Sequence, residues 1–417
     1  MRKITTNMLK TKIRILYIGP IPPEVGGKSP GGIAIHCWQL ATQAHKRGYD
    51  VYVLANTASS FIKEGVKVIS QSQRQRSKLS KAFYTLKFWL IANKNILNSL
   101  NFLSLKQKVS VLYGACLLKE VIRLVNPHLI HIHSLHNVQT LSLKLLKKSA
   151  PLIITHYESY SCAKRGKTIA ILNSTVSMAD YLICCTEYNK DKLKELGIKY
   201  SKNSKIIHIP VDTGKVPLLE KEEIRHELGF DNKKKVVLFS GVYKPIKKKG
   251  LDILLRAFCV NRYLRDNCKL IVHSNEEGIK YANKIIEREN IDGILLGTLP
   301  WKKLVKYYNA SDIFVMPSRS EGFGIVYVEA LLTGCPIIGF HGTLKEIKSV
   351  LGIYVGEKFD ASKENENSLA EKIIKVLNTN LDRDLLRRKT IESLSWDAKF
   401  SEFGSVYQEA LRNRLQK

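Results

Sequence analysis

Acidic residues are scarce in this sequence: 37 Asp and Glu stand against 67 Lys and Arg, which gives a formal net charge of +30. The shortage is greatest between Glu64 and Glu120, where no acidic residue occurs. Such a charge attracts phosphorylated substrates, nucleic acid or anionic membranes, and it says nothing about the fold. Because no known nucleic-acid-binding motif accompanies the charge, we expect no nucleic-acid partner.

Two other features are missing. The eight cysteines include no Cys-x-x-Cys pair, which argues against zinc and a disulfide framework and favours a reducing cytosol. No stretch reaches the roughly 18 apolar residues needed to span a bilayer, and the first apolar run, 13–18, is too short for a signal peptide. We therefore expect a cytoplasmic protein of 417 residues, which is long enough for two domains.

The N-terminal half alternates short apolar runs with helical segments. A β-rich run at 12–19 precedes a loop that ends at Gly31 and Gly32, then a helical segment and a second β-rich run at 50–54. Strand, glycine-rich loop, helix and strand form a βαβ unit, which binds its ligand at the carboxyl end of the first strand. A flexible loop with no ligand is the alternative for the two glycines.

A later β-rich run, 127–133, carries His131 and His133. Residues two apart lie on the same face of a strand, so the two rings are expected side by side. They would suit a metal only with further ligands, and no further ligand is evident nearby. The sequence therefore predicts no metal site at this strand.

The segment 61–120, which contains the acid-free stretch, is rich in leucine and aromatic residues interleaved with lysine and arginine. A basic amphipathic stretch with aromatics is typical of a helix that lies in a membrane interface. In the alternative, the apolar face packs on its own domain and the lysines are merely solvated. The lack of acids favours peripheral association with an anionic membrane.

After a polar interval at 213–234, which we interpret as a linker, the strand and helix pattern resumes. A β-rich run ends at Gly241, and a basic loop with Lys249 and Gly250 leads into a helical segment that starts at residue 251. A lysine near a helix N-terminus favours phosphate both by its charge and by the helix dipole. The alternative is a run of solvated lysines.

The most informative stretch is 317–336. The apolar run before it indicates a buried strand, Glu321 to Gly324 a tight turn, and the segment 325–332 a helix that Gly334 ends. Glu329 is the only charge in that segment, so we expect it to be largely buried and to need a partner.

Glu321 lies on the loop at the positive end of this helix. The backbone N–H groups of Gly324 and Ile325 would point outward there and could bind a phosphate. In the alternative, Glu329 is bound to backbone and the glycines only shape a turn.

These residues resemble the signature of the retaining glycosyltransferases of family 4, a Glu-Gly-Phe-Gly loop with a second Glu after seven intervening residues. The resemblance covers nearly the whole chain. It implies an α/β protein of the GT-B fold, with two Rossmann-like domains facing each other across a cleft. The expected parts are an acceptor-binding domain at 1–213, a nucleotide-sugar-binding domain at 214–395 and a C-terminal helix at 396–417 that returns to the first domain.

The resemblance also implies roles for the motif residues. Glu329 would bind the ribose of a nucleotide sugar, and Glu321 would hold hydroxyls of the donor sugar. Lys249 would stabilise the departing diphosphate together with the loop amides, so no metal and no cofactor are expected. The donor-binding residues would be Gly241, Lys249, Glu321, Gly322, Phe323, Gly324, Ile325 and Glu329, and Glu321 and Lys249 would be the catalytic ones.

Gly31, Gly32, His156 and Tyr157 are the expected acceptor-side residues, and the sequence departs from the family's pattern near them. Tyr157 stands where the family usually has a histidine near the donor sugar, and His156 comes one residue early. Two further departures lie in the second half of the chain. Val242 replaces an arginine after the strand's glycine, and His273 replaces a glycine.

The resulting expectation is a transferase that moves a hexose-type sugar from a nucleotide diphosphate sugar to a glycan or lipid-linked acceptor. Surface polysaccharide biosynthesis at the inner face of the plasma membrane is the expected setting. Two alternatives stay open. One is a GT-B enzyme of another reaction, such as a sugar-nucleotide epimerase or a phosphorylase. The other is a membrane-associated scaffold with a degenerate donor site.

Overall fold

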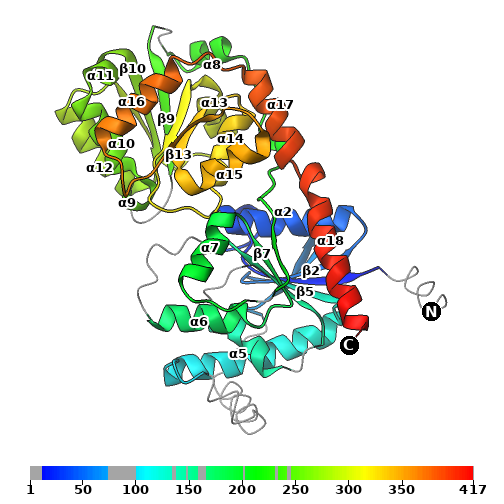
Figure 1. Ribbon diagram of the computed structural model, residues 1–417. Coiled ribbons are helices and arrows are strands. Elements are labelled where there is room, and N and C mark those ends of the chain that lie inside the picture. Colours follow the sequence, from blue (N-terminus) through cyan, green and yellow to red (C-terminus); the bar gives the residue numbers. More distant parts are fainter. Residues whose placement is uncertain are drawn as a thin grey trace. The chain divides into compact units, whose positions relative to one another are not determined.

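The computed structural model describes residues 12–73, 100–133, 138–146, 149–157, 166–200, 202–230, 233–241 and 246–416. The chain divides into two compact units. The first consists of Met1–Ile207 and Phe400–Lys417, and the second of His208–Lys399. Each unit contains its own predominantly parallel sheet (Figure 1).

The described strands of the first unit form a sheet in the order β3-β4-β2-β1-β5-β6-β7-β8. Among them only β3 and β4 pair antiparallel. The strands are β1 (Arg14–Ile18), β2 (Asp50–Ala55), β3 (Phe61–Lys63), β4 (Val66–Ser70), β5 (Leu129–His133), β6 (Leu152–His156), β7 (Tyr181–Cys184) and β8 (Ser204–Ile206).

Helices cover both faces of this sheet, which is why its central strands read as nearly continuous apolar runs. All five residues of β5 are buried. Figure 1 shows α5 and α6 together on one face, where they enclose an apolar core. The helical elements are η1 (Pro23–Val25), α2 (Gly32–Lys46), α5 (Leu105–Val125), η2 (Val138–Leu145), α6 (Gly166–Val176) and α7 (Glu187–Glu195).

The segment 61–120 is not one amphipathic stretch, and that expectation was wrong for its first described end, whereas its other described end contains the first part of helix α5. Residues 61–70 form the β3–β4 hairpin at the sheet edge. Its turn residues, Glu64 and Gly65, have φ of 50° and 77°, the left-handed conformation that tight two-residue hairpin turns require. Helix α5 starts at a capping box made by Ser104 and Gln107. Residues 74–99 lie outside the described part of the chain.

The described strands of the second unit form a parallel sheet in the order β11-β10-β9-β12-β13-β14. They are β9 (Lys235–Gly241), β10 (Cys268–Ser274), β11 (Gly293–Leu296), β12 (Ile313–Met316), β13 (Ile337–Phe340) and β14 (Gly356–Phe359). The helical elements are η3 (Thr213–Lys215), α8 (Lys221–Glu227), α9 (Ile246–Lys249), α10 (Leu251–Val260), α11 (Arg262–Asn267), α12 (Glu276–Arg288), α13 (Trp301–Ala310), α14 (Ile325–Leu332), α15 (His341–Leu351), α16 (Glu366–Leu377) and α17 (Arg383–Leu394).

The polar interval at 213–234 is not a free linker, because α8 packs on the second unit. Lys221 Nζ and an Arg225 guanidinium nitrogen each lie 2.5 Å from a carboxylate oxygen of Asp312. Burial alone would raise the pKa of Asp312, but the two cations hold it below its usual value. The polar and charged residues suggested a linker, but Lys221 forms its ion pair with Asp312, which lies 91 residues away in the sequence, and so attaches the segment to the second unit.

The last helix, α18 (Trp396–Leu415), begins in the second unit, and its residues from Phe400 onward belong to the first. Its Tyr407 hydroxyl lies 3.1 Å from that of Tyr17 in β1, and the Arg47 guanidinium lies over the ring of Phe400. Among the helices in the described ranges, none combines the length and apolarity that crossing a bilayer requires.

Candidate active site

The residues of the family-like motif gather where the strand order of the second unit reverses. From β9 the sheet extends to β10 on one side and to β12 on the other. In open parallel sheets such a switch point is the usual ligand site, at the carboxyl ends of the strands. Gly241 ends β9, and Pro317 directly follows β12. The two loops that leave these strands carry the expected donor-side residues.

Lys249 and Glu321 form an ion pair at this edge. Lys249 Nζ lies 2.6 Å from Glu321 Oε1, which also accepts a hydrogen bond of 2.8 Å from the Ser318 hydroxyl. The Glu321 side chain is 7% exposed, whereas that of Lys249 is 21% exposed. Since an ammonium has three N–H donors, Lys249 can keep this bond and still present donors to an anion.

The loop 317–324 is anchored on α9 and α10 by an arginine that the sequence analysis did not single out. Arg319 makes two hydrogen bonds of 2.8 Å to the two carboxylate oxygens of Asp252, and its backbone N–H donates to Lys248 O at 2.9 Å. Planar pairing of this kind fixes orientation as well as distance. The sequence feature that could have indicated this contact is Asp252, because it is an acidic residue within an otherwise apolar helical turn.

Gly250 allows the close approach of these two loops. It has φ +82°, and a Cβ at this position would lie 2.1 Å from Pro317 O. Both the left-handed conformation and the lack of space require glycine. The glycine between Lys249 and α10 therefore sets the distance between the lysine and the glutamate loop.

The far end of the loop is held by Tyr327 of α14. Its buried hydroxyl donates to Met316 O at 2.7 Å and accepts from the Phe340 N–H at 3.0 Å, which ties the helix to β12 and β13. Gly324 caps α14 with φ +73°, and no side chain of the described residues caps this helix. The first N–H groups of α14 are thus available to a ligand.

Within the described residues, Glu329 lacks the partner that was expected for a largely buried carboxylate. The residue is partly buried, and no residue in the described part of the chain is hydrogen-bonded to its carboxylate. Burial raises its pKa to about 7. The helix therefore holds a poorly solvated carboxylate that a ligand with hydroxyl donors would satisfy.

His273 is a buried residue of β10 beside β9. Its Nδ1 lies 2.8 Å from the Ser240 hydroxyl oxygen, and burial lowers its pKa to about 4. A neutral imidazole thus occupies the place where the family usually has glycine. Val242 lies outside the described residues.

In the first unit, Tyr157 joins two histidines. Its hydroxyl is hydrogen-bonded to His36 Nδ1 at 2.7 Å and to His133 Nδ1. His156, the preceding residue, is fully buried at the end of β6. Gly31 caps α2 with φ +108°, and Gly32 is the first residue of that helix.

His131 and His133 do share a strand face, because their ring centroids are 4.4 Å apart. His131 Nε2 is bonded to the Thr155 hydroxyl at 2.7 Å, and its Nδ1 to that of Tyr407 at 3.0 Å. Burial lowers the pKa of His36 and His131 to about 3. Among the residues that the structure describes, no group of three His, Cys, Asp or Glu is placed to hold a metal ion.

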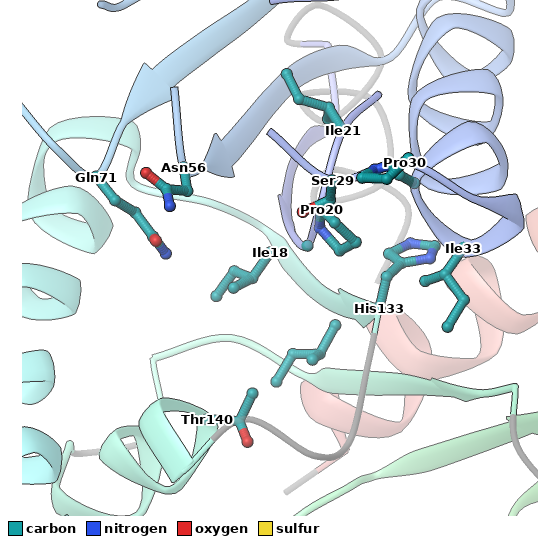
Figure 2. Close-up of a pocket in the computed structure, with 13 residues that line it drawn as sticks. Ile18, Pro20, Ile21, Ser29, Pro30, Ile33, Asn56, Gln71, His133 and Thr140 are labelled. Carbon is teal, nitrogen blue, oxygen red and sulfur yellow. The ribbon is translucent and has the colours of Figure 1, made fainter. Parts of the chain in front are cut away.

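A cavity of about 580 Å³ lies in the first unit where β1 and β5 end (Figure 2). Its polar lining side chains are Ser29, Asn56, Gln71, His133 and Thr140, and its other lining residues include several isoleucines and prolines. The cavity lies at the switch point of this sheet, since β1 pairs with β2 on one side and with β5 on the other.

Two family models match the chain. The model described as Glycosyl transferases group 1 matches residues 220–393, and that described as Glycosyltransferase Family 4 matches residues 30–215. An uncharacterized glycosyltransferase of Methanocaldococcus jannaschii is 29% identical over 270 residues, which are 63% of this chain and 70% of that protein. Two further curated relatives are matched over only 49% and 37% of their own length.

The chain also resembles proteins of known structure. The sucrose-phosphate synthase of Thermosynechococcus elongatus superposes with a TM-score of 0.71 at 16% identity, over 96% of this chain and all of that one. An Anabaena protein, HepE, solved with UDP and glucose, gives 0.69 at 16% identity, over 95% of this chain and all of that one. These likenesses show the fold, which is GT-B, and the expected fold class is confirmed.

Proposed function

Because this chain belongs to the group 1, family 4 glycosyltransferases, we propose that it is a retaining enzyme using a nucleotide diphosphate sugar. The second unit would bind the donor, and the first would bind a glycan or lipid-linked acceptor. The observation that carries this proposal is the ion pair of Lys249 and Glu321, 2.6 Å apart beside the switch point of β9 and β12.

The proposed chemistry follows from where charge develops. When the bond between the anomeric carbon and the phosphate oxygen breaks, negative charge accumulates on the departing diphosphate. The Lys249 ammonium and the first N–H groups of α14 stabilise that charge. Glu321 holds hydroxyls of the donor sugar and so supplies position. The acceptor hydroxyl attacks on the side the diphosphate leaves, and its proton passes to the departing phosphate, so the anomeric configuration is retained.

Three further donor-side assignments rest on this geometry. Glu329 binds the ribose hydroxyls, since its half-buried carboxylate lacks a partner in the described part of the chain. The backbone of Gly322, Phe323 and Ile325 shapes the loop around the diphosphate, with Phe323 buried beneath it at 1% exposure. Gly241 ends the strand from which the lysine loop departs.

The acceptor-side assignments fall in the first unit. Gly31 and Gly32 begin α2 next to two cavity-lining residues, Pro30 and Ile33. Tyr157 acts through His133, to which it is hydrogen-bonded and which lines the cavity. His156 is fully buried, so of the two neighbours we assign the acceptor-side role to Tyr157.

The first test is thermal stabilisation of the purified chain by UDP, GDP, ADP and CDP and by their sugars. A ligand at 100 times its dissociation constant adds about 2.7 kcal/mol to the free energy of unfolding. One stabilising base, followed by a product with the donor's anomeric configuration in NMR, supports the proposal. Sugar conversion without an acceptor would indicate an epimerase instead. No stabilisation by any nucleotide would favour the scaffold alternative.

We also propose peripheral binding to an anionic membrane through α5. Leu105, Val109 and Leu124 are 79%, 43% and 62% exposed on this helix, and Lys106 and Arg123 are exposed near them. Exposed apolar side chains beside cations suit an interface of anionic lipid.

The membrane test is sedimentation with vesicles of phosphatidylcholine and phosphatidylglycerol. The double variant Leu105→Asp/Val109→Asp should lose most of the bound fraction. Ile62→Asp, which alters another exposed apolar side chain, at 72% exposure in β3, is the matched control and should leave it nearly unchanged. Equal binding by the double variant and the control would contradict the membrane proposal.

A further inference from the structure

The cavity at the switch point of the first unit has the size and lining of a small-molecule site. Its volume of about 580 Å³ lies within the range of roughly 300–1,000 Å³ that is usual for ligand pockets. Ligand sites of this kind combine apolar walls with a few convergent polar groups. Ile18, Ile33 and Ile132 provide apolar wall here.

Two amide side chains form one side of the cavity. Asn56 follows β2 and Gln71 follows β4, and Figure 2 shows their amide ends close together, across the cavity from Ile33. Asn56 Oδ1 accepts a hydrogen bond of 2.9 Å from the Ser72 hydroxyl, which orients the amide and leaves its NH2 group to donate. An amide carries both donors and acceptors, so paired amides recognise hydroxyl groups.

His133 adds a buried polar atom to the same cavity. Its side chain is 1% exposed, and its Nδ1 is bonded to the Tyr157 hydroxyl. Its Nε2 has no hydrogen-bond partner in the part of the chain that the structure describes. A buried polar atom without a partner costs roughly 1–3 kcal/mol, a cost that a ligand hydroxyl would remove.

The described polar side chains that line the cavity are all neutral, in a protein of net charge +30. Burial holds the pKa of His133 well below its usual value, so its ring is uncharged as well. Proteins bind phosphate groups with arginine and lysine, and among the described residues neither type lines this cavity. A sugar ring has hydroxyls at its edge and C–H groups on its faces, which matches amides and imidazole set among isoleucines.

We propose that this cavity binds an uncharged sugar residue as the acceptor, through Asn56, Gln71 and His133, and that it discriminates against phosphorylated sugars. The proposal rests on the proposed function, because only a transferase has an acceptor site. It narrows the acceptor from any glycan or lipid-linked group to one whose reacting end is a neutral sugar.

The test is calorimetric titration of the full chain with methyl glycosides of glucose, galactose and N-acetylglucosamine and with the 6-phosphates of the same sugars. Titrations are made with and without the nucleoside diphosphate that stabilises the protein best. At least one neutral glycoside should bind, at least tenfold more tightly than its 6-phosphate. Asn56→Ala and Gln71→Ala should each weaken it at least tenfold. Gln43→Ala, a glutamine of α2 outside the cavity, is the matched control and should not.

Tighter binding of a 6-phosphate than of its neutral counterpart would overturn the proposal. So would no binding of any neutral glycoside, or equal losses in the cavity variants and in Gln43→Ala. Stabilisation by the nucleotide should be unchanged in all three variants, which shows that they fold. If the nucleotide still binds while these tests fail, only the acceptor inference falls. If no nucleotide stabilises the chain at all, the proposed function falls.

Discussion

In both units the strand order reverses in the middle of a parallel sheet, between β1 and β5 in the first and between β9 and β12 in the second. The chemistry at the two reversals differs. The first carries neutral imidazoles, a tyrosine and amides. The second carries the ion pairs Lys249–Glu321 and Arg319–Asp252. The topology decides where a ligand binds, and the side chains at that edge decide which ligand it is.

The two edges also differ in how they respond to protons. Burial lowers the pKa of His36, His131 and His133 in the first unit. In the second unit it lowers that of His273 but raises that of Glu329 to about 7. As the pH falls below 7, the shift of His273 lowers the free energy of unfolding, whereas the shift of Glu329 raises it. In the first unit, the shifts of all three histidines lower it.

The largest expected effect is on turnover, and it concerns the sheet edge of the second unit that carries the Lys249–Glu321 ion pair, which we call the charged edge. Lys249→Ala removes the ammonium that faces the departing diphosphate, and loss of one such donor costs about 10²–10³ in turnover. The measurement is the steady-state rate with a saturating nucleotide sugar. Lys247→Ala, an exposed lysine of the same short helix, is the matched control and should keep nearly full activity. Equal rates in the two variants would remove Lys249 from the mechanism.

The second-largest expected effect is a difference between the two units in how their stability depends on pH. Each buried neutral histidine has a folded pKa below its unfolded value of about 6.5, so the unfolded chain binds more protons below that pH. The free energy of unfolding should then fall by about 1 kcal/mol per histidine between pH 7 and 5.5.

Hydrogen exchange, corrected for intrinsic rates, measures this difference strand by strand. Protection of β5 should fall more than that of β9, because Glu329 offsets His273 in the second unit. Equal losses in both strands would show that the histidines of the first unit do not control its stability.

A third prediction concerns the close approach that builds the charged edge. Gly250→Ala should lower the free energy of unfolding by about 3 kcal/mol, since left-handed backbone and a clash with Pro317 O add together. Gly352→Ala is the matched control. Gly352 has φ +66° but nothing within 4 Å of a Cβ, and about 1 kcal/mol is expected. Chemical denaturation measures both, and similar losses would argue against the proposed contact.

The smallest expected effect is on the nucleotide. Glu329→Gln replaces a charged acceptor of ribose hydroxyls by a neutral one and should weaken nucleoside diphosphate binding about tenfold at pH 8. Because the free carboxyl has a pKa of about 7 and hydroxyls prefer its ionised form, affinity in the unaltered chain should rise from pH 6 to 8. Calorimetry should show this rise vanish in Glu329→Gln and persist in Glu277→Gln, an exposed control on α12.

The sequence alone was enough for the fold class and for the position of the motif. Continuous apolar runs, glycine-rich loops and the Gly334 stop predicted strand, loop and helix at the charged edge, and β12 and α14 lie there. These features are local. A short apolar run or a glycine after a helix acts largely through its own backbone.

The partners of the site residues were decided only by the tertiary structure. Lys249 meets Glu321 across 72 residues and Arg319 meets Asp252 across 67, while Glu329, expected to have a partner, has none among the described residues. Tyr157 reaches His36 across 121 residues. Periodicity within one element shows which face a side chain occupies. The order of strands in the sheet determines what lies opposite that face, and no local pattern encodes that order.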